Sequence, residues 1–371
     1  MASKGTTELN SLYAGDFYGE GDDFQQDYHE FNEEDFSLYI RNSQEDYEFL
    51  NETLNELDWY NSTEPLTDES LFDRRETITQ KQAIQELVDN TNFNKKEATE
   101  LIKQLKKDGY ELLNSETQDG EYYFNLRLGN QLLQLSASSL NVMTSEAEHT
   151  LFGDITHVSP SEFCHYFAKE LPDIYKFYPG KIEYYGNSRF EEEGTVEGGY
   201  YHPLGNSVHL GPESTRSWEY KRVLEHELTH RLDNYGGRSR TDSDLMFAPS
   251  LTHISDHPMF KIASEVFTAS NYSNSYYGSD PHPYFKSKYR QENFAESTAP
   301  LGTQSYVDTP LNSKVQWTPY TDYQKYNSYG DYIGRNVREA KTPKQVIEFL
   351  NKEYIQYRER NPEIFEKYET E

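Results

Sequence analysis

Apolar residues first recur at helical spacing after Thr79, and the pattern predicts two consecutive helices. One apolar face covers residues 83–88, and a second covers residues 98–105. Asn92 to Asn94 form a polar turn between them. The second helix is expected to end at Asp108-Gly109, because glycine readily adopts the left-handed conformation that closes many helices.

A pair of strands is expected directly after these helices. Residues 110–113 and 122–128 lie on either side of a Gln118-Asp119-Gly120 turn. Helix, turn, helix and hairpin resemble a winged-helix module, which we place at residues 67–140. Residues 81–111 carry six lysines against six acidic residues, so the positive surface typical of DNA binding is missing. We therefore expect the module to dock on protein, and we do not expect nucleic acid as a partner.

A second folded region is predicted over residues 145–371, where short strands and helices alternate. Residues 196–201 and 207–210 flank a Pro203-Leu204-Gly205-Asn206 turn and predict a hairpin. Pro343 opens a final helix, since proline is favoured in the first helical turn. The apolar face of that helix carries Val346, Ile347, Leu350 and Tyr354.

Two stretches show no sustained periodicity. Residues 1–66 combine acidic residues with Tyr, Phe, Gly and Asn, and we interpret them as an acidic, largely extended arm. The aromatic residues of this arm are too frequent for a purely solvating tail. We expect the arm to dock on a protein partner or on the chain's own folded part. Residues 301–336 are rich in Tyr, Ser, Thr, Asn, Pro and Gly, which indicates a long surface insertion.

The net charge of −29 is concentrated at the start of the chain. Residues 1–60 hold 16 acidic residues against Lys4 and Arg41, and so carry −14 of it. A field of this sign repels nucleic acid and favours basic partners or substrates.

Cysteine content and hydropathy indicate where in or outside a cell the protein is expected. Cys164 is the only cysteine, so no intrachain disulfide can form, and its apolar neighbours favour a buried thiol over a nucleophile. No apolar run approaches the roughly 20 residues that span a bilayer, and the N-terminus does not resemble a secretory signal peptide. We expect a cytoplasmic, virion-associated or injected protein without a membrane anchor.

The strongest chemical signal is His226-Glu227-Leu228-Thr229-His230. Residues 218–234 carry apolar positions at helical spacing, with Ser217 as a plausible N-cap and Gly236-Gly237 as the stop. His226 and His230 are four residues apart, so both imidazoles project from one helical face and can share a zinc ion. Glu227 stands beside them, in position to take a proton from a water molecule on the metal.

A catalytic zinc site needs a third protein ligand and an open fourth position. Three places downstream offer candidates: Glu265 on an expected helix of residues 260–267, His253 and His257 in a loop-like stretch, and Glu292 with Glu296 on one helical face. Spacing alone does not choose between Glu265 and Glu292.

The stretch from His226 to Gly236, HELTHRLDNYG, resembles the zinc helix of the anthrax lethal factor-like (ATLF-like) zinc metallopeptidases. Residues 291–296, QENFAE, resemble the family's Glu-Phe-Phe-Ala-Glu motif, whose first Glu is the third zinc ligand. The resemblance therefore implies His226, His230 and Glu292 as metal ligands, and it leaves Glu265 a structural residue.

Further blocks extend this resemblance to about residues 150–357. Residues 201–210 resemble the hairpin whose second strand borders the family's substrate cleft, and we expect that strand at a sheet edge, where an extended peptide can add to it. Residues 257–262 resemble the helix between the two zinc-binding helices, and residues 342–350 resemble the closing helix.

The resemblance implies an α+β, zincin-like domain and a zinc-dependent endopeptidase with Glu227 as general base. The family places a catalytic tyrosine about seven residues before the ligand Glu, where this chain has Phe285. We expect Tyr284 to stabilise the oxyanion in its place, with Tyr289 as the alternative. Glu296, or less favourably Asp233, is expected to accept a hydrogen bond from a ligand histidine.

Two other functions are compatible with the same motifs. One is a catalytically weak or inactive metallopeptidase fold that serves as a structural or virion-associated binding protein. The other is a regulatory peptidase in which a helix-turn-helix module is joined to the His-Glu-x-x-His domain and the target is a repressor. The expected substrate in the principal interpretation is a peptide or protein, with basic sequences favoured by the acidic surface.

Overall fold

The computed structural model describes residues 75–145, 148–150, 153–184, 198–203, 206–217, 219–236, 253–257, 259, 283–298, 334–360 and 362. The expected arm lies outside the described residues, and so does the expected insertion up to residue 333. The described part is an α+β fold with one mixed sheet, and it contains no helix long and apolar enough to cross a membrane.

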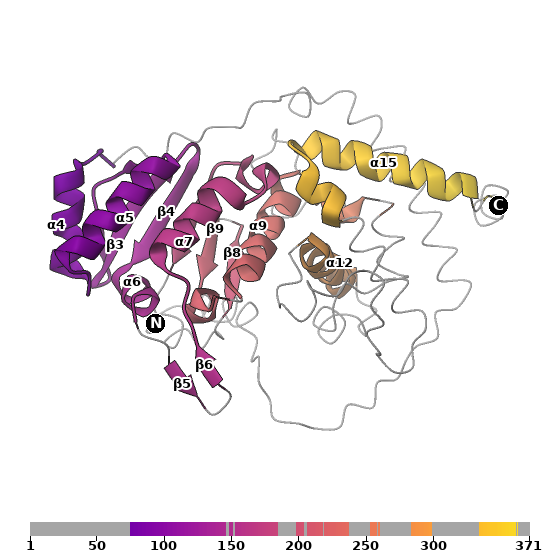
Figure 1. The fold of residues 1–371 in the computed structure, drawn as a ribbon. Coiled ribbons are helices and arrows are strands. Elements are labelled where there is room, and N and C mark those ends of the chain that lie inside the picture. Colours follow the sequence, from indigo (N-terminus) through magenta and orange to yellow (C-terminus); the bar gives the residue numbers. More distant parts are fainter. Residues whose placement is uncertain are drawn as a thin grey trace, which may run out of the picture. The chain divides into compact units, whose positions relative to one another are not determined.

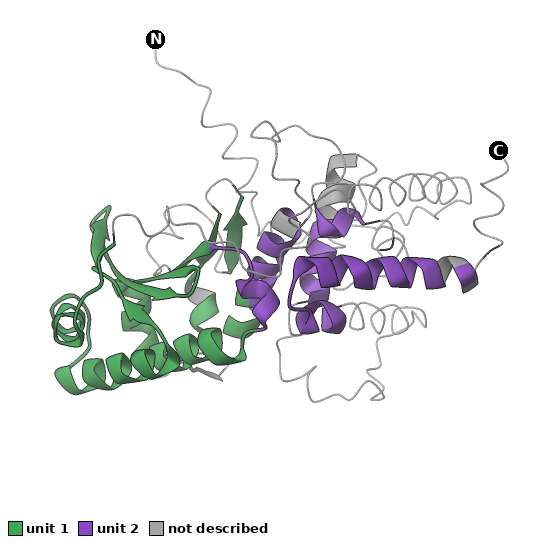
Figure 2. Ribbon diagram, turned by 90° about the horizontal axis from the view of Figure 1, so that it is seen from above, with its two compact units in different colours: residues 1–26, 68–171, 180–224 green, residues 27–67, 172–179, 225–371 purple. Residues whose placement is uncertain are grey.

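Figure 2 shows the two compact units of the chain in different colours. Within the described residues, the first unit comprises residues 75–171 and 180–224, and the second comprises residues 172–179 and 225–362. The division between the units falls inside one helix, α9 (Tyr220–Gly236).

Two helices open the first unit, and local capping residues set their ends. Helix α4 (Gln80–Asn90) begins after Thr79, and helix α5 (Lys95–Asp108) begins after Asn94. Both N-caps form capping boxes with the residue three positions later, which satisfies backbone N–H groups that the first helical turn leaves free. Gly109 ends α5 in the left-handed region, with φ of 101°. The two expected helices are confirmed.

The sheet of the first unit has seven strands in the order β1-β3-β4-β7-β9-β8, with β2 also paired to β3. Its strands are β1 (Glu111–Leu112), β2 (Glu116–Gln118), β3 (Glu121–Leu128), β4 (Gln131–Ser136), β7 (Gly180–Tyr184), β8 (Gly199–His202) and β9 (Ser207–Leu210). The pairs β4–β7 and β7–β9 are parallel, and the other pairs are antiparallel. The sheet therefore continues through the strands of the expected winged-helix-like module into β7, beyond residue 145.

The hairpin β8–β9 corrects one expectation about the sheet edge. The resemblance placed the second strand, residues 207–210, at an edge, but β9 pairs with β8 on one side and with β7 on the other. The edge strand is β8. The prediction was wrong because the partner β7 lies elsewhere in the sequence, and hairpin geometry alone does not show which strand acquires a further neighbour.

Helices and a separate pair of strands complete the first unit (Figure 1). Helix α7 (Pro160–His165) lies beside α5, and α6 (Ala137–Met143) contacts β3 and β4. The strands β5 (Glu148–Thr150) and β6 (Gly153–Ile155) pair with each other in a small antiparallel sheet, and the unit also contains a π-helical turn η2 (Tyr166–Glu170) and a 3-10 turn η4 (Pro212–Thr215). Cys164 on α7 is fully buried, as expected for a core thiol.

The second unit is mainly helical. It contains most of α9, together with η3 (Asp173–Lys176), η6 (Ile254–Asp256), α12 (Pro283–Thr298) and α15 (Pro343–Arg360). The apolar face expected for the last helix is confirmed, because Val346, Ile347, Leu350 and Tyr354 are all buried. A helical segment over residues 334–339 precedes α15. Its first residue must be small, since a Cβ on Gly334 would lie 1.7 Å from the carbonyl oxygen of Ser297.

Candidate metal centre

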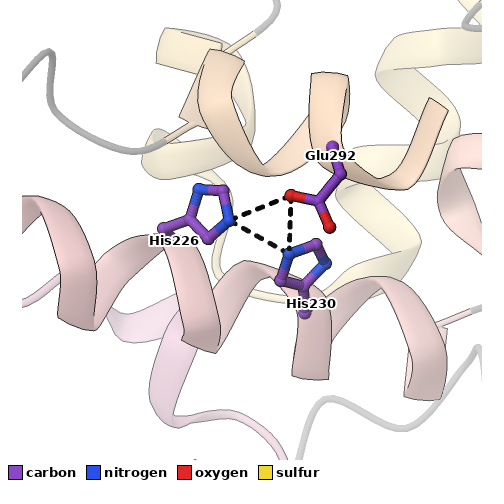
Figure 3. Close-up of side chains that lie close together, drawn as sticks. All are labelled: His226, His230 and Glu292. Atoms are coloured by element: carbon purple, nitrogen blue, oxygen red, sulfur yellow. Dashed lines mark hydrogen bonds and ion pairs between the residues drawn. The ribbon is translucent and has the colours of Figure 1, made fainter. Parts of the chain in front are cut away.

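Helices α9 and α12 bring His226, His230 and Glu292 together within the second unit. The two histidines stand one helical turn apart on α9, so their rings share one face, with ring centroids 4.8 Å apart. Glu292 reaches them from α12, as Figure 3 shows. These three side chains are the one group among the described residues that could hold a metal ion.

The three donor atoms form a nearly regular triangle. The two Nε2 atoms of His226 and His230 are 3.1 Å apart. Oε2 of Glu292 lies 3.3 Å from the first and 3.4 Å from the second (Figure 3). A single ion could therefore bind all three atoms, and three protein ligands leave the fourth position of a tetrahedral ion for another molecule.

Glu296 lies next to the nitrogen of His226 that is not part of the triangle. It lies one helical turn after Glu292 on α12, and its Oε1 is 3.0 Å from Nδ1 of His226. A carboxylate on the second imidazole nitrogen fixes the ring orientation and directs the other nitrogen towards the ion. Glu296 thus lies within ion-pair distance of the ring, and its role as a hydrogen-bond acceptor stays a prediction.

The charges of the cluster shift the pKa values of its members in opposite directions. Burial lowers the pKa of His226, but the carboxylates of Glu292 and Glu296 outweigh it and raise the pKa to about 10. Burial raises the pKa of Glu292, but His230 and His226 outweigh it and hold the pKa of this carboxyl far below its ordinary range. The carboxylate is thus kept in the ionised form that binds metal.

Glu227 lies on α9 directly after the first ligand and is 6% exposed. Burial raises its pKa; the two histidines act against this shift, and the carboxylates of Glu292 and Glu296 add to it. A carboxylate with a raised pKa is a stronger base than an exposed one, as proton transfer requires.

The other candidate residues of the site have different partners or lie outside the described residues. His257 contacts Oδ1 of Asn351 at 2.9 Å and accepts from the backbone N–H of Met259. His253 faces Asp256. Asp233 accepts hydrogen bonds from the N–H and the hydroxyl of Ser255, at 2.6 and 2.8 Å, rather than from a ligand histidine. Glu265 lies outside the described residues.

Tyr284 and Tyr289 both belong to α12, which begins at Pro283. Only the backbone of these two residues is described. The choice between them as the oxyanion donor stays a prediction.

Two sets of polar contacts, here called clamps, join the ligand helices α9 and α12. The first clamp runs through the turn η6, and the sequence did not predict it. Asp233 on α9 holds Ser255 of this turn. The next residue, Asp256, pairs with Arg290 of α12 at 2.9 Å. Burial raises the pKa of Asp256, but His253 and Arg290 outweigh it and lower the pKa. Arg290 lies two positions before Glu292, so this pair helps fix where the third ligand stands.

A second clamp lies at the other end of α12. The hydroxyls of Thr229 on α9 and Thr298 on α12 are 2.6 Å apart. Arg338 pairs with the fully buried carboxylate of Glu225 and donates to the carbonyl of Thr298 at 3.3 Å. Glu225 directly precedes the first ligand. The one signal in the sequence was an acidic residue at this position of the helix, which needs a basic partner such as Arg338 once it is buried.

Breaking the first clamp is expected to weaken metal binding. Arg290→Gln leaves the carboxylate of Asp256 buried with less compensation, at a cost of about 3–5 kcal/mol in the free energy of unfolding. We also expect the affinity for a divalent ion to fall about 10–100-fold, as it does when a group that orients ligands is removed. Titration with Zn2+ and urea unfolding measure the two effects. Arg335→Gln, at an exposed position, is the matched control, and equal zinc affinity in the two variants would contradict the role of the clamp.

The same clamp gives stability a pH dependence. The pKa of Asp256 is lowered in the folded protein. Its contribution to the free energy of unfolding is therefore present above the ordinary pKa of the carboxyl and is lost as pH falls through the pKa of the folded state. Asp256→Asn should therefore flatten the acid limb of the curve of unfolding free energy against pH. An unchanged acid limb in urea unfolding would argue against this pairing.

Comparisons with protein-family models, with curated proteins and with solved structures found no match to this chain. The resemblance to the lethal factor-like metallopeptidases consequently remains a prediction from motifs. The metal centre rests on the positions of its own side chains: two histidines on one helix, a carboxylate on a second helix and a further carboxylate behind the first imidazole.

Proposed function

We propose that the protein is a zinc-dependent endopeptidase of the lethal factor-like type, with a zincin-like catalytic domain. The observation that carries the proposal is the triangle of donor atoms with edges of 3.1, 3.3 and 3.4 Å. Tetrahedral zinc with bonds of roughly 2.0–2.1 Å to nitrogen and oxygen separates its ligand atoms by about 3.3–3.4 Å. Two imidazoles and one carboxylate are also a donor set used by zinc in peptidases.

The chemistry is divided between the ion and the chain. Bound zinc lowers the pKa of a water molecule and polarises a carbonyl group. Glu227 takes a proton from the attacking water and delivers it to the leaving amine, for which its buried position and raised pKa suit it. Glu296 keeps the ring of His226 in the orientation that presents Nε2.

The substrate we propose is an extended stretch of polypeptide. The net charge of −29 favours basic sequences around the cleaved bond, since opposite charge steers association. Tyr284 is proposed to donate a hydrogen bond to the oxyanion that forms as water attacks.

Removing the third ligand should remove the metal. We expect Glu292→Ala to bind less than 0.1 equivalent of zinc after gel filtration, roughly, because two histidines alone do not complete a catalytic site. Elemental analysis of the purified protein measures the content. Glu348→Ala, at an exposed position of α15, is the control and should keep a full equivalent. Full zinc content in the Glu292 variant would overturn the ligand assignment.

Removing the base should separate chemistry from metal binding. Glu227→Gln keeps the size of the side chain but cannot accept the proton, so we expect zinc content to stay at one equivalent and kcat to fall at least about 100-fold. Cleavage of a proteome-derived peptide library, followed by mass spectrometry, measures both activity and preferred sequence. A zinc-loaded wild-type protein that cleaves nothing in such a library would instead favour a structural or virion-associated binding protein.

The oxyanion donor can be assigned by a pair of conservative variants. Tyr284→Phe removes one hydroxyl from α12 and is expected to lower kcat about 100-fold with KM nearly unchanged, because the lost hydrogen bond forms only in the transition state. Tyr289→Phe on the same helix is the control. The reverse result, with the loss in the Tyr289 variant, would transfer the role to that residue.

A further inference from the structure

A second cluster of reactive side chains lies on the sheet of the first unit. Strands β7 and β9 pair in parallel, with Lys181 opposite Ser207 and Glu183 opposite His209. Because side chains alternate along a strand, all four lie on one face. The residues between them point to the other face and are fully buried in the core.

Three of these side chains form a continuous relay. The hydroxyl oxygen of Ser207 is 2.6 Å from Nε2 of His209. Nδ1 of the same ring is 3.3 Å from Oε2 of Glu183. The carboxylate favours the tautomer with its proton on Nδ1, which leaves Nε2 to accept the proton of the serine hydroxyl.

The surroundings keep the relay in place. Tyr200 on β8 stacks on the ring of His209, with centroids 4.5 Å apart and planes within 7°. Lys181 pairs with the other oxygen of Glu183. Ser207, Glu183 and His209 are 3, 6 and 9% exposed, so bulk water is largely excluded from the relay.

We propose that Ser207, His209 and Glu183 form a second catalytic site, a serine esterase that acts on small acyl esters. Serine, imidazole and carboxylate in this order of contacts are the arrangement that activates a hydroxyl nucleophile. The slight exposure of the serine restricts the substrate to a small acyl group. This site shares no residue with the metal centre and does not depend on the proposed peptidase function.

The reaction needs water as the only co-substrate. The Ser207 hydroxyl transfers its proton to Nε2 of His209 as its oxygen bonds to the ester carbonyl carbon. The bond from that carbon to the alcohol oxygen then breaks, and the alcohol leaves with the proton from Nε2. Water attacks the acyl-serine by the same route and releases the acid and the free hydroxyl.

A purely structural role for the relay is the contrasting possibility, and the position of the serine hydroxyl argues against it. Lys181 balances the charge of Glu183, but that ion pair does not require a hydroxyl 2.6 Å from Nε2 of His209. A histidine held between a buried acid and a hydroxyl is the environment found at catalytic sites.

The test uses the full-length, zinc-loaded protein and a small alkyl fluorophosphonate, which bonds to activated serine hydroxyls. We expect one adduct per chain, located at Ser207 by peptide mapping, and slow hydrolysis of p-nitrophenyl acetate. His209→Gln should slow adduct formation about 100-fold or more, and Ser207→Ala should abolish it. Ser214→Ala is the matched control, because Ser214 is likewise a buried serine of this unit but donates to the carbonyl of Gly198.

Mapping on the wild-type chain decides the question even if a variant fails to fold. Absence of an adduct at Ser207 in the folded wild-type protein would overturn the proposal and leave the relay a structural feature. An adduct that forms equally fast in the folded His209 variant would overturn it as well. Both readouts are independent of peptide cleavage, so failure here leaves the metal-centre proposal intact.

Discussion

The candidate metal centre depends on one electrostatic constraint, a carboxylate held against two imidazoles inside the protein. Oε2 of Glu292 lies 3.3–3.4 Å from the two histidine nitrogens, and all three side chains are largely removed from solvent. A buried cluster of one carboxylate and two imidazoles is stable only when the negative charge of the carboxylate is balanced by a positive charge. A divalent cation bound by the three side chains would supply that balance, and Glu296 lies 3.0 Å from the other nitrogen of the first imidazole, where a carboxylate can orient the ring.

The protein meets this constraint with two helices that are joined by polar contacts on either side of the ligands. The first clamp runs through Ser255 and Asp256 to Arg290, and the second joins Thr229 to Thr298 and Arg338 to Glu225. Hydrogen bonds and ion pairs are directional, so they fix the rotation and the shift of one helix against the other more tightly than apolar packing does. The third ligand is placed by these contacts, which lie within the same unit as the site.

How far the sequence predicts the structure depends on the range of the contacts involved. The ends of α5 and the common face of His226 and His230 are local properties, set by Asn94, Gly109 and a four-residue spacing, and these were predictable. Glu292 could not be chosen over Glu265 by spacing, since the packing of two distant helices decides it. The same limit explains the wrong edge assignment of β9 and the unforeseen pairing of Asp256 with Arg290.

X-ray absorption at the zinc K-edge tests the central claim most directly, because it reports the ligands around the ion in the intact protein. We predict two imidazole nitrogens and two further oxygen donors, one from Glu292 and one from solvent, at about 2.0–2.1 Å. The spectrum of Glu292→Gln protein should change in the first shell. A wild-type spectrum with a third imidazole, or with a sulfur ligand at about 2.3 Å, would contradict the metal centre described above.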